Sequence, residues 1–154
     1  MNLSRKDKIR GSLIGGAIGD ALGYPVEFAS YSNIKYLFGE NGITRFVLNN
    51  NGVAEISDDT QMTLFTANGL LYGITRFCMR GIGSDLFNYV AIAYDEWLQT
   101  QMELPLEDEW HTCWIRNISA LNSRRAPGNT CLSALTALRE QKAVSNNSKG
   151  CGGV

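Results

Sequence analysis

The stretch GSLIGGAIGDALGYPVEF, residues 11–28, combines a helical apolar pattern with glycines at regular four-residue intervals. Because four residues are close to one helical turn, these glycines form one stripe along a helix. They are Gly11, Gly15, Gly19 and Gly23. The apolar residues of the same region keep the helical period, namely Ile9, Leu13, Ile14, Ala17, Ile18, Ala21 and Leu22. We therefore predict a helix over residues 5–23 that begins with a capping box of Ser4 and Asp7.

The glycine stripe has two interpretations. A glycine inside a helix costs about 1 kcal/mol of stability relative to alanine, so a row of glycines needs a compensating close contact. That contact is either the backbone of a second helix packed tightly against the stripe or a ligand in a cleft that the stripe lines. Both interpretations stay open at this point.

The rest of the chain is predicted to be helical with one irregular region. Pro25 ends the first helix, and residues 31–55 are predicted to be irregular, with turns at 41–42 and 51–52 and a short strand at 43–48. A second helix is expected to begin at Asp58 or Asp59. Its inward side chains are predicted to be Met62, Phe65, Leu70, Ile74 and Phe77.

Three further helices follow in this prediction. The first is capped by Ser84 and carries an apolar face of Phe87, Val90, Tyr94, Trp97 and Leu98. The second follows Pro105 and carries Trp110, Trp114, Ile118 and Leu121. After a turn at 124–129, the third carries Leu132, Leu135 and Leu138, and residues 145–154 are expected to form a loop. The pattern predicts an all-α fold and a single domain over residues 1–154.

Composition excludes several classes of function. The net charge is −1 and the basic residues form no stripe, so we expect no nucleic-acid surface. Asp20 interrupts the N-terminal apolar run, which is also too short to cross a bilayer, and we expect neither a targeting segment nor a membrane partner. The four cysteines form no C-x-x-C pair, which predicts reduced thiols, no zinc site and a cytoplasmic location.

The segment SDDT, residues 57–60, gathers side-chain oxygens at the start of the second predicted helix. Asp58 with Gln61 matches a capping box, and acidic residues in a first turn suit the helix dipole. That explanation accounts for one aspartate better than for an adjacent pair. Hard oxygen ligands on Ser57, Asp58 and Asp59 also suit Mg²⁺, Ca²⁺ or Mn²⁺, and a cation would relieve the repulsion within the pair.

Four blocks together resemble the ADP-ribosylglycohydrolase family, which includes the dinitrogenase-reductase activating glycohydrolase. They are GSLIGGAIGDALGYPVEF, SDDTQMT, RRAPGNTCLSAL and SKGCGGV, and they occur in the family's order over nearly the whole chain. The resemblance implies a compact all-α fold with two Mg²⁺ or Mn²⁺ ions in a central cleft. It also implies hydrolysis of a glycosidic bond between ADP-ribose and a protein side chain, or in a related ADP-ribose derivative.

The resemblance assigns roles by position in this sequence. The first cluster of metal ligands matches Ser57, Asp58 and Asp59, with serine in place of the threonine common in the family. Glu27 matches an acidic residue with an acid/base or substrate-gating role, and its apolar neighbours are expected to raise its pKa; otherwise it is a solvated turn residue. The residues matched to a ribose contact are Gly128, Asn129 and Thr130.

A glycine-rich block matches the family's loop near the diphosphate, and its alternative is a flexible tail. Its residues are Gly150, Cys151, Gly152 and Gly153. His111 matches no role in the family and is expected to be structural or exposed.

One departure from the family concerns the second acidic cluster, a Gly-x-Asp-x-Asp-Thr segment of the family's C-terminal half. The only Asp-Asp-Thr of this sequence is at 58–60. We therefore expect an N-terminal half that binds metal weakly or not at all and exposes apolar helix faces. Such a chain is expected to self-associate or to pair with a separate C-terminal half. A degenerate, catalytically inactive relative that binds ADP-ribose or serves a structural role, and an unrelated helical interaction protein, stay open as alternatives.

Overall fold

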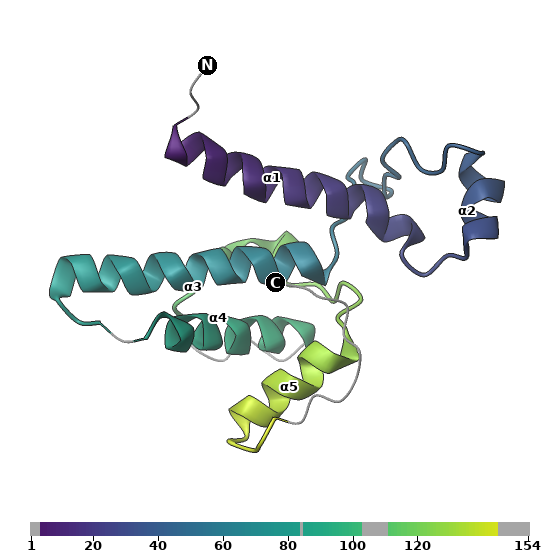
Figure 1. Cartoon of the computed structure of the whole chain (residues 1–154). Coiled ribbons are helices and arrows are strands. Elements are labelled where there is room, and N and C mark those ends of the chain that lie inside the picture. Colours follow the sequence, from purple (N-terminus) through teal and green to yellow (C-terminus); the bar gives the residue numbers. More distant parts are fainter. Residues whose placement is uncertain (1–3, 84, 103–110, 145–154) are drawn as a thin grey trace. The chain divides into compact units, whose positions relative to one another are not determined.

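The structure, a computed structural model, describes residues 4–83, 85–102 and 111–144 (Figure 1). The chain separates into two compact units at the junction of Thr60 and Gln61, and each unit is described by itself. The described residues are helical, with no strand beyond one isolated bridge between Leu48 and Ala54, which confirms the all-α prediction.

The first unit begins with α1, Arg5–Gly23, as the sequence predicts. The Asp7 backbone N–H donates to Ser4 Oγ at 3.2 Å, and the Ser4 hydroxyl donates to Asp7 Oδ2 at 2.6 Å. This reciprocal pair confirms the predicted helix start. A short 3-10 helix, η1 (Tyr24–Val26), continues from α1 with proline in its first turn.

The region predicted to be irregular contains a helix, α2, Tyr31–Phe38. Ser30 caps it by accepting from the Asn33 N–H at 3.3 Å, and Gly39 ends it with a φ of 81°. A serine before and a glycine after an apolar segment are the local signals of a short helix. The predicted strand at 43–48 is wrong, since the described residues pair only through the single bridge.

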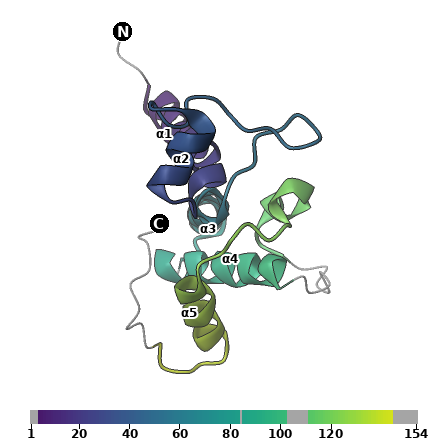
Figure 2. The same cartoon turned by 90° about the vertical axis from the view of Figure 1, so that its right-hand side faces the viewer.

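The second unit contains most of α3 (Asp58–Arg80), followed by α4 (Leu86–Gln101) and α5 (Asn129–Arg139). Helices α3 and α4 lie side by side, and α5 packs against α4 (Figures 1 and 2). A buried side-chain amide joins the core: Gln61 Oε1 accepts from Trp97 Nε1 at 3.1 Å and from Gln101 Nε2 at 3.0 Å. Around it the core is formed by Met62, Phe65, Ala93, Leu98, Cys113, Ile115 and Leu121.

Several predictions for the second unit need correction. The cap of α4 is Asp85, whose carboxylate accepts from the Phe87 N–H at 3.1 Å; Ser84 lies outside the described residues. On α3 the predicted inward residues Ile74 and Phe77 are 49% and 60% exposed, so this prediction is wrong for both. On α4, Phe87 is also exposed.

The predicted helix after Pro105 is also wrong in the part that the structure describes. Residues 111–121 form two short 3-10 helices, η2 (Trp114–Asn117) and η3 (Ser119–Leu121), separated by an extended Ile118. Residues 103–110 and the predicted loop at 145–154 lie outside the described residues. Trp114 is 61% exposed, although the sequence predicted it on an apolar helix face.

Close approach of helices occurs at glycines of α3 rather than at the stripe of α1. A Cβ added at Gly69 would lie 2.8 Å from the Tyr89 carbonyl oxygen, and one at Gly73 would meet the Tyr89 ring. Across the described chain, nothing lies within 4 Å of the corresponding positions of the α1 stripe, Gly11 to Gly23. No described helix combines the length and the apolar character needed to cross a membrane.

We predict opposite effects of alanine at the two kinds of glycine. Gly69→Ala should lower the free energy of unfolding by about 1–3 kcal/mol, because the new methyl group meets a backbone oxygen that cannot move aside. Gly15→Ala, the matched control in open space, should raise it by up to about 1 kcal/mol. Urea denaturation of the two variants measures both changes, and equal effects would contradict the close approach of α3 and α4.

Candidate functional site

Ser57 caps α3, where the sequence predicted a capping box of Asp58 and Gln61. Ser57 Oγ accepts from the Asp59 backbone N–H at 3.2 Å. The Gln61 side chain does not reach back to the helix start; its Nε2 donates to the Ser123 carbonyl oxygen at 2.9 Å in the core of the second unit. The predicted box is therefore wrong, and both aspartates occupy the first turn, where the helix dipole favours negative charge.

Asp20, near the end of α1, holds the segment that contains these aspartates. Its Oδ2 accepts from the Ser57 backbone N–H at 2.8 Å and from the Thr60 hydroxyl. Ser57 and Thr60 are buried, at 3% and 6% exposure. Sequence reasoning treated Asp20 only as an interruption of an apolar run. That interruption was itself the signal, because an acid on an apolar helix face is expected to have a buried partner.

The acids of this unit act on one another. Partial desolvation raises the pKa of Glu27, and the charges of Asp58, Asp59 and Asp20 raise it further, in that order. The pKa of Asp59 is raised by partial burial and by the charge of Asp20. The direction for Glu27 agrees with the expectation from the sequence, although its side chain is exposed and Phe28 beside it is 78% exposed.

These acids offer hard oxygen donors and mutually repelling negative charge, which is the chemistry that a divalent cation stabilises. The Ser57 hydroxyl retains acceptor capacity beside its contact with Asp59. Within the described ranges, however, no three His, Cys, Asp or Glu side chains converge as a group that could hold an ion. Ser57, Asp58 and Asp59 therefore fit a part of a coordination shell.

The residues matched to substrate contacts lie elsewhere in the chain. Gly128 occupies the N-cap position of α5, and Asn129 and Thr130 begin that helix in the second unit. The glycine-rich block at 150–153 lies outside the described residues. His111 was expected to be structural or exposed, and the structure shows it exposed. The first unit thus brings together Glu27, Asp58 and Asp59, and adds Asp20 to the predicted set.

The coupling of these acids predicts the effect of Asp20→Asn. The substitution keeps an acceptor oxygen for Ser57 and Thr60 but removes the charge, so the pKa of both Glu27 and Asp59 should fall toward the ordinary range. NMR titration of the carboxyl carbons measures this shift. Asp7→Asn, at the exposed start of α1, is the control and should leave both pKa values unchanged.

The same coupling gives a sign for the pH dependence. Because folding raises the pKa of Glu27 and Asp59, the folded protein binds their protons more tightly than the unfolded chain does. Their contribution to stability is full below the unfolded pKa and is lost as the pH rises through the folded pKa. Asp20→Asn should weaken that loss, and an unchanged pH profile of stability would contradict the proposed coupling.

Comparison with known proteins gives one family. The family model of ADP-ribosylglycohydrolases matches residues 1–154. A relative from Archaeoglobus fulgidus, described as an uncharacterized protein, is 38% identical over 69 residues, which are 43% of this chain and 22% of the relative. The matched part of the chain thus spans about a fifth of that relative's length. No solved structure matches the chain. The match over the full sequence shows that this chain belongs to the ADP-ribosylglycohydrolase family.

Proposed function

We propose that the chain serves a glycosidic-bond hydrolase that removes ADP-ribose from a modified protein side chain or cleaves a related ADP-ribose derivative. The observation that carries the proposal is the family match over residues 1–154. The local support is the group of acids around the start of α3, in which Glu27 has a raised pKa. Hydrolysis at an anomeric carbon needs a side chain that exchanges a proton and a means of orienting water. The acids around the start of α3 suit both requirements.

In this proposal Ser57, Asp58 and Asp59 hold Mg²⁺ or Mn²⁺, as part of a site for two ions in the complete family arrangement. The bound metal supplies Lewis-acid chemistry that lowers the pKa of water. Asp20 holds the Ser57–Thr60 segment through the Ser57 N–H and the Thr60 hydroxyl, so it positions the carboxylates. Glu27 takes or gives the proton, because its raised pKa brings it closer to neutral pH.

The substrate contacts rest on the resemblance. We propose that Gly128, Asn129 and Thr130 contact the ribose. We propose that the backbone of the glycine-rich block, Gly150, Cys151, Gly152 and Gly153, contacts the diphosphate, since backbone N–H groups suit oxyanions. We also infer a cytoplasmic location from the dispersed cysteines, of which Cys78 and Cys113 carry free thiols.

A second candidate function is a catalytically inactive relative that binds ADP-ribose or serves a structural role. The observation that favours it is the incomplete ligand set: among the residues that the structure describes, no group of three acids, histidines or cysteines could hold an ion. A weakly bound metal would leave the glycosidic bond intact. The two candidates differ in whether metal-dependent hydrolysis occurs.

Calorimetric titration of Mn²⁺ and then ADP-ribose into the purified chain tests the metal assignment. The double variant Asp58→Ala, Asp59→Ala should lose the heat of metal binding, because it removes both proposed carboxylate ligands. Its circular dichroism should stay unchanged, because the substitutions also remove like-charge repulsion with Glu27. Glu27→Gln should keep the metal heat and slow hydrolysis of an ADP-ribosylated peptide by about 100- to 10,000-fold. If the double variant still shows the heat of metal binding, the assignment of the metal site to Asp58 and Asp59 is wrong. Metal binding without hydrolysis by the unmodified chain supports the inactive relative.

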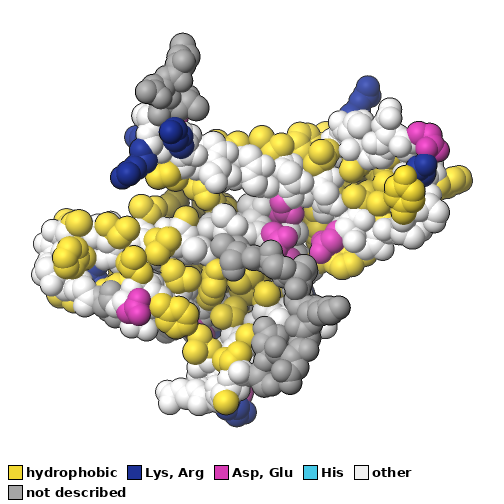
Figure 3. All heavy atoms as spheres, viewed as in Figure 1, with side chains coloured by type: hydrophobic (Ala, Val, Ile, Leu, Met, Phe, Trp, Pro, Cys, Tyr) yellow, Lys and Arg dark blue, Asp and Glu magenta, His cyan; other side chains and the backbone are white. Residues whose placement is uncertain are grey.

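We propose in addition that the chain associates, either with itself or with a separate C-terminal half. Large apolar side chains lie on the visible surface of both units (Figure 3). On α1 the exposed ones are Ile9, Ile14 and Ile18, and on α3 they are Leu71, Ile74 and Phe77. Many exposed large apolar side chains favour association in soluble proteins when they adjoin one another, as Leu71, Ile74 and Phe77 do at helical spacing on α3.

Sedimentation velocity measures this association. We expect a concentration-dependent rise of the sedimentation coefficient, and the double variant Ile74→Lys, Phe77→Lys should weaken it about tenfold or more, because each lysine places a charge on an apolar contact. Lys6→Glu on the polar start of α1 is the control and should change little. A monomer that persists at high concentration would exclude the association.

A further inference from the structure

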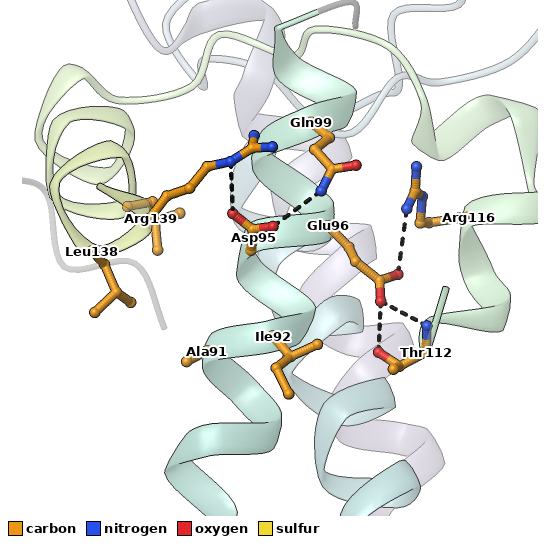
Figure 4. A pocket seen from close by; sticks show the side chains of 10 residues that line it. Ala91, Ile92, Asp95, Glu96, Gln99, Thr112, Arg116, Leu138 and Arg139 are labelled. Atoms are coloured by element: carbon orange, nitrogen blue, oxygen red, sulfur yellow. Dashed lines mark hydrogen bonds and ion pairs between the residues drawn. The ribbon is translucent and has the colours of Figure 1, made fainter. Parts of the chain in front are cut away.

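The second unit contains a cavity of about 480 Å³ whose wall is part apolar and part charged. It lies among α4, α5 and the segment around η2 (Figure 4). Its apolar wall is formed by Ala91, Ile92, Leu135 and Leu138. A volume of this size is in the range that small-molecule sites occupy, and a few polar groups in an apolar wall are their usual composition.

Arg116 on η2 gives this cavity a buried positive charge with unused donors. Its side chain is 3% exposed, and its Nε and Nη2 have no hydrogen-bond acceptor among the described residues. Its Nη1 lies 3.7 Å from Glu96 Oε2, which is an ion pair but too long for a hydrogen bond. Because arginine stays protonated in proteins, a buried guanidinium without acceptors is costly.

Glu96 cannot supply the missing acceptor without giving up other contacts. Its Oε1 accepts from the Thr112 N–H at 2.7 Å and from the Thr112 hydroxyl at 2.6 Å. Its Oε2 accepts from the Cys113 N–H at 3.1 Å. These donors hold the carboxylate against the chain at 112–113 and disperse its charge, so the guanidinium keeps capacity for another oxyanion.

The other charges of the wall are matched nearer to solvent. Asp95 Oδ1 lies 3.6 Å from Arg139 Nε, with side chains 38% and 45% exposed, and Asp95 Oδ2 accepts from Gln99 Nε2 at 3.0 Å. Arg116 is therefore a buried cation of this wall whose Nε and Nη2 have no acceptor among the described residues, and Glu96 lies between it and Leu138 in Figure 4.

We propose that this cavity binds a small carboxylate with an aliphatic body, the carboxylate on Arg116 and the body against Ile92, Leu135 and Leu138. A carboxylate is the anion whose geometry a guanidinium matches best. Nε and Nη2 are themselves buried, so in this proposal ligand binding turns the guanidinium until one of these donors faces the cavity. The proposal does not depend on the proposed hydrolysis, because it uses none of the acids of the first unit.

Hexanoate is the probe, compared with hexanol, which has a similar body without charge, and with acetate, which has the charge with little body. Each is titrated into the full chain at constant ionic strength while ¹H–¹⁵N amide shifts are recorded. Hexanoate should saturate shifts in α4 and α5 and bind about tenfold or more tightly than either comparator, because only hexanoate satisfies both parts of the wall. Equal affinity of hexanol, equal affinity of acetate, or no saturation overturns the proposal.

Two variants separate binding from folding. Arg116→Met should abolish the preference for hexanoate over hexanol, but it leaves Glu96 without its ion pair and risks unfolding. Ala91→Phe fills the cavity from α4 while leaving Arg116 and Glu96 in place, and it should weaken hexanoate about tenfold or more. Tyr36→Ala, at an exposed position of α2 outside the cavity, is the control and should leave hexanoate affinity unchanged. Unchanged affinity in a folded Ala91→Phe variant places the ligand elsewhere and overturns the proposal.

Discussion

The carboxylate of Asp20 is the constraint on which the acidic site depends. One oxygen accepts from the backbone N–H of Ser57 and from the hydroxyl of Thr60, so it joins the end of α1 to both sides of the aspartate pair. Charge-assisted hydrogen bonds of this kind are roughly twice as strong as neutral ones. Without them, Ser57 would still cap α3, but these two bonds between α1 and the α3 start would be lost.

This constraint also has an electrostatic cost. The charge that holds Ser57 and Thr60 raises the pKa of Asp59 and contributes to the raised pKa of Glu27. The helix dipole offsets part of the repulsion at the first turn of α3, but it decays within that turn. A neutral acceptor at position 20 would remove this repulsion, but it would also weaken the two hydrogen bonds that hold Ser57 and Thr60. Charge kept against stability is typical of sites that bind a cation or move a proton.

Sequence reasoning worked where the determinant was local. Ser4 with Asp7 located the start of α1, and the 3.6-residue period located α3, α4 and α5, because caps and periodicity act within a few residues. It failed for α2, where the Ser30 and Gly39 signals were present but were outweighed by the surrounding turns. It also assigned Gln61 to a capping box, since spacing alone cannot show that a side chain points into a core.

The site divides in the same way. Ser57, Asp58 and Asp59 were identified from their oxygen ligands and the resemblance, and Glu27 from the resemblance, and all lie in one unit. Asp20, which holds the Ser57–Thr60 segment, is separated from Ser57 by 37 positions. Arg116 escaped notice for a similar reason: its partner Glu96 is twenty residues away, and only the tertiary structure shows that the partner is already occupied by Thr112 and Cys113. Burial of charged side chains depends on such distant contacts, which carry no pattern in sequence.

The exposed apolar side chains and the proposed metal ligands have one feature in common: an associating partner would add contacts to both. Among the described residues no group of three His, Cys, Asp or Glu side chains could hold an ion, and large apolar side chains of α1 and α3 are exposed. In the proposed association, a partner that brings oxygen donors to the start of α3 would add ligands to Ser57, Asp58 and Asp59 and so raise the affinity for a divalent cation. Association and metal binding are then thermodynamically linked, and each should strengthen the other by the same factor.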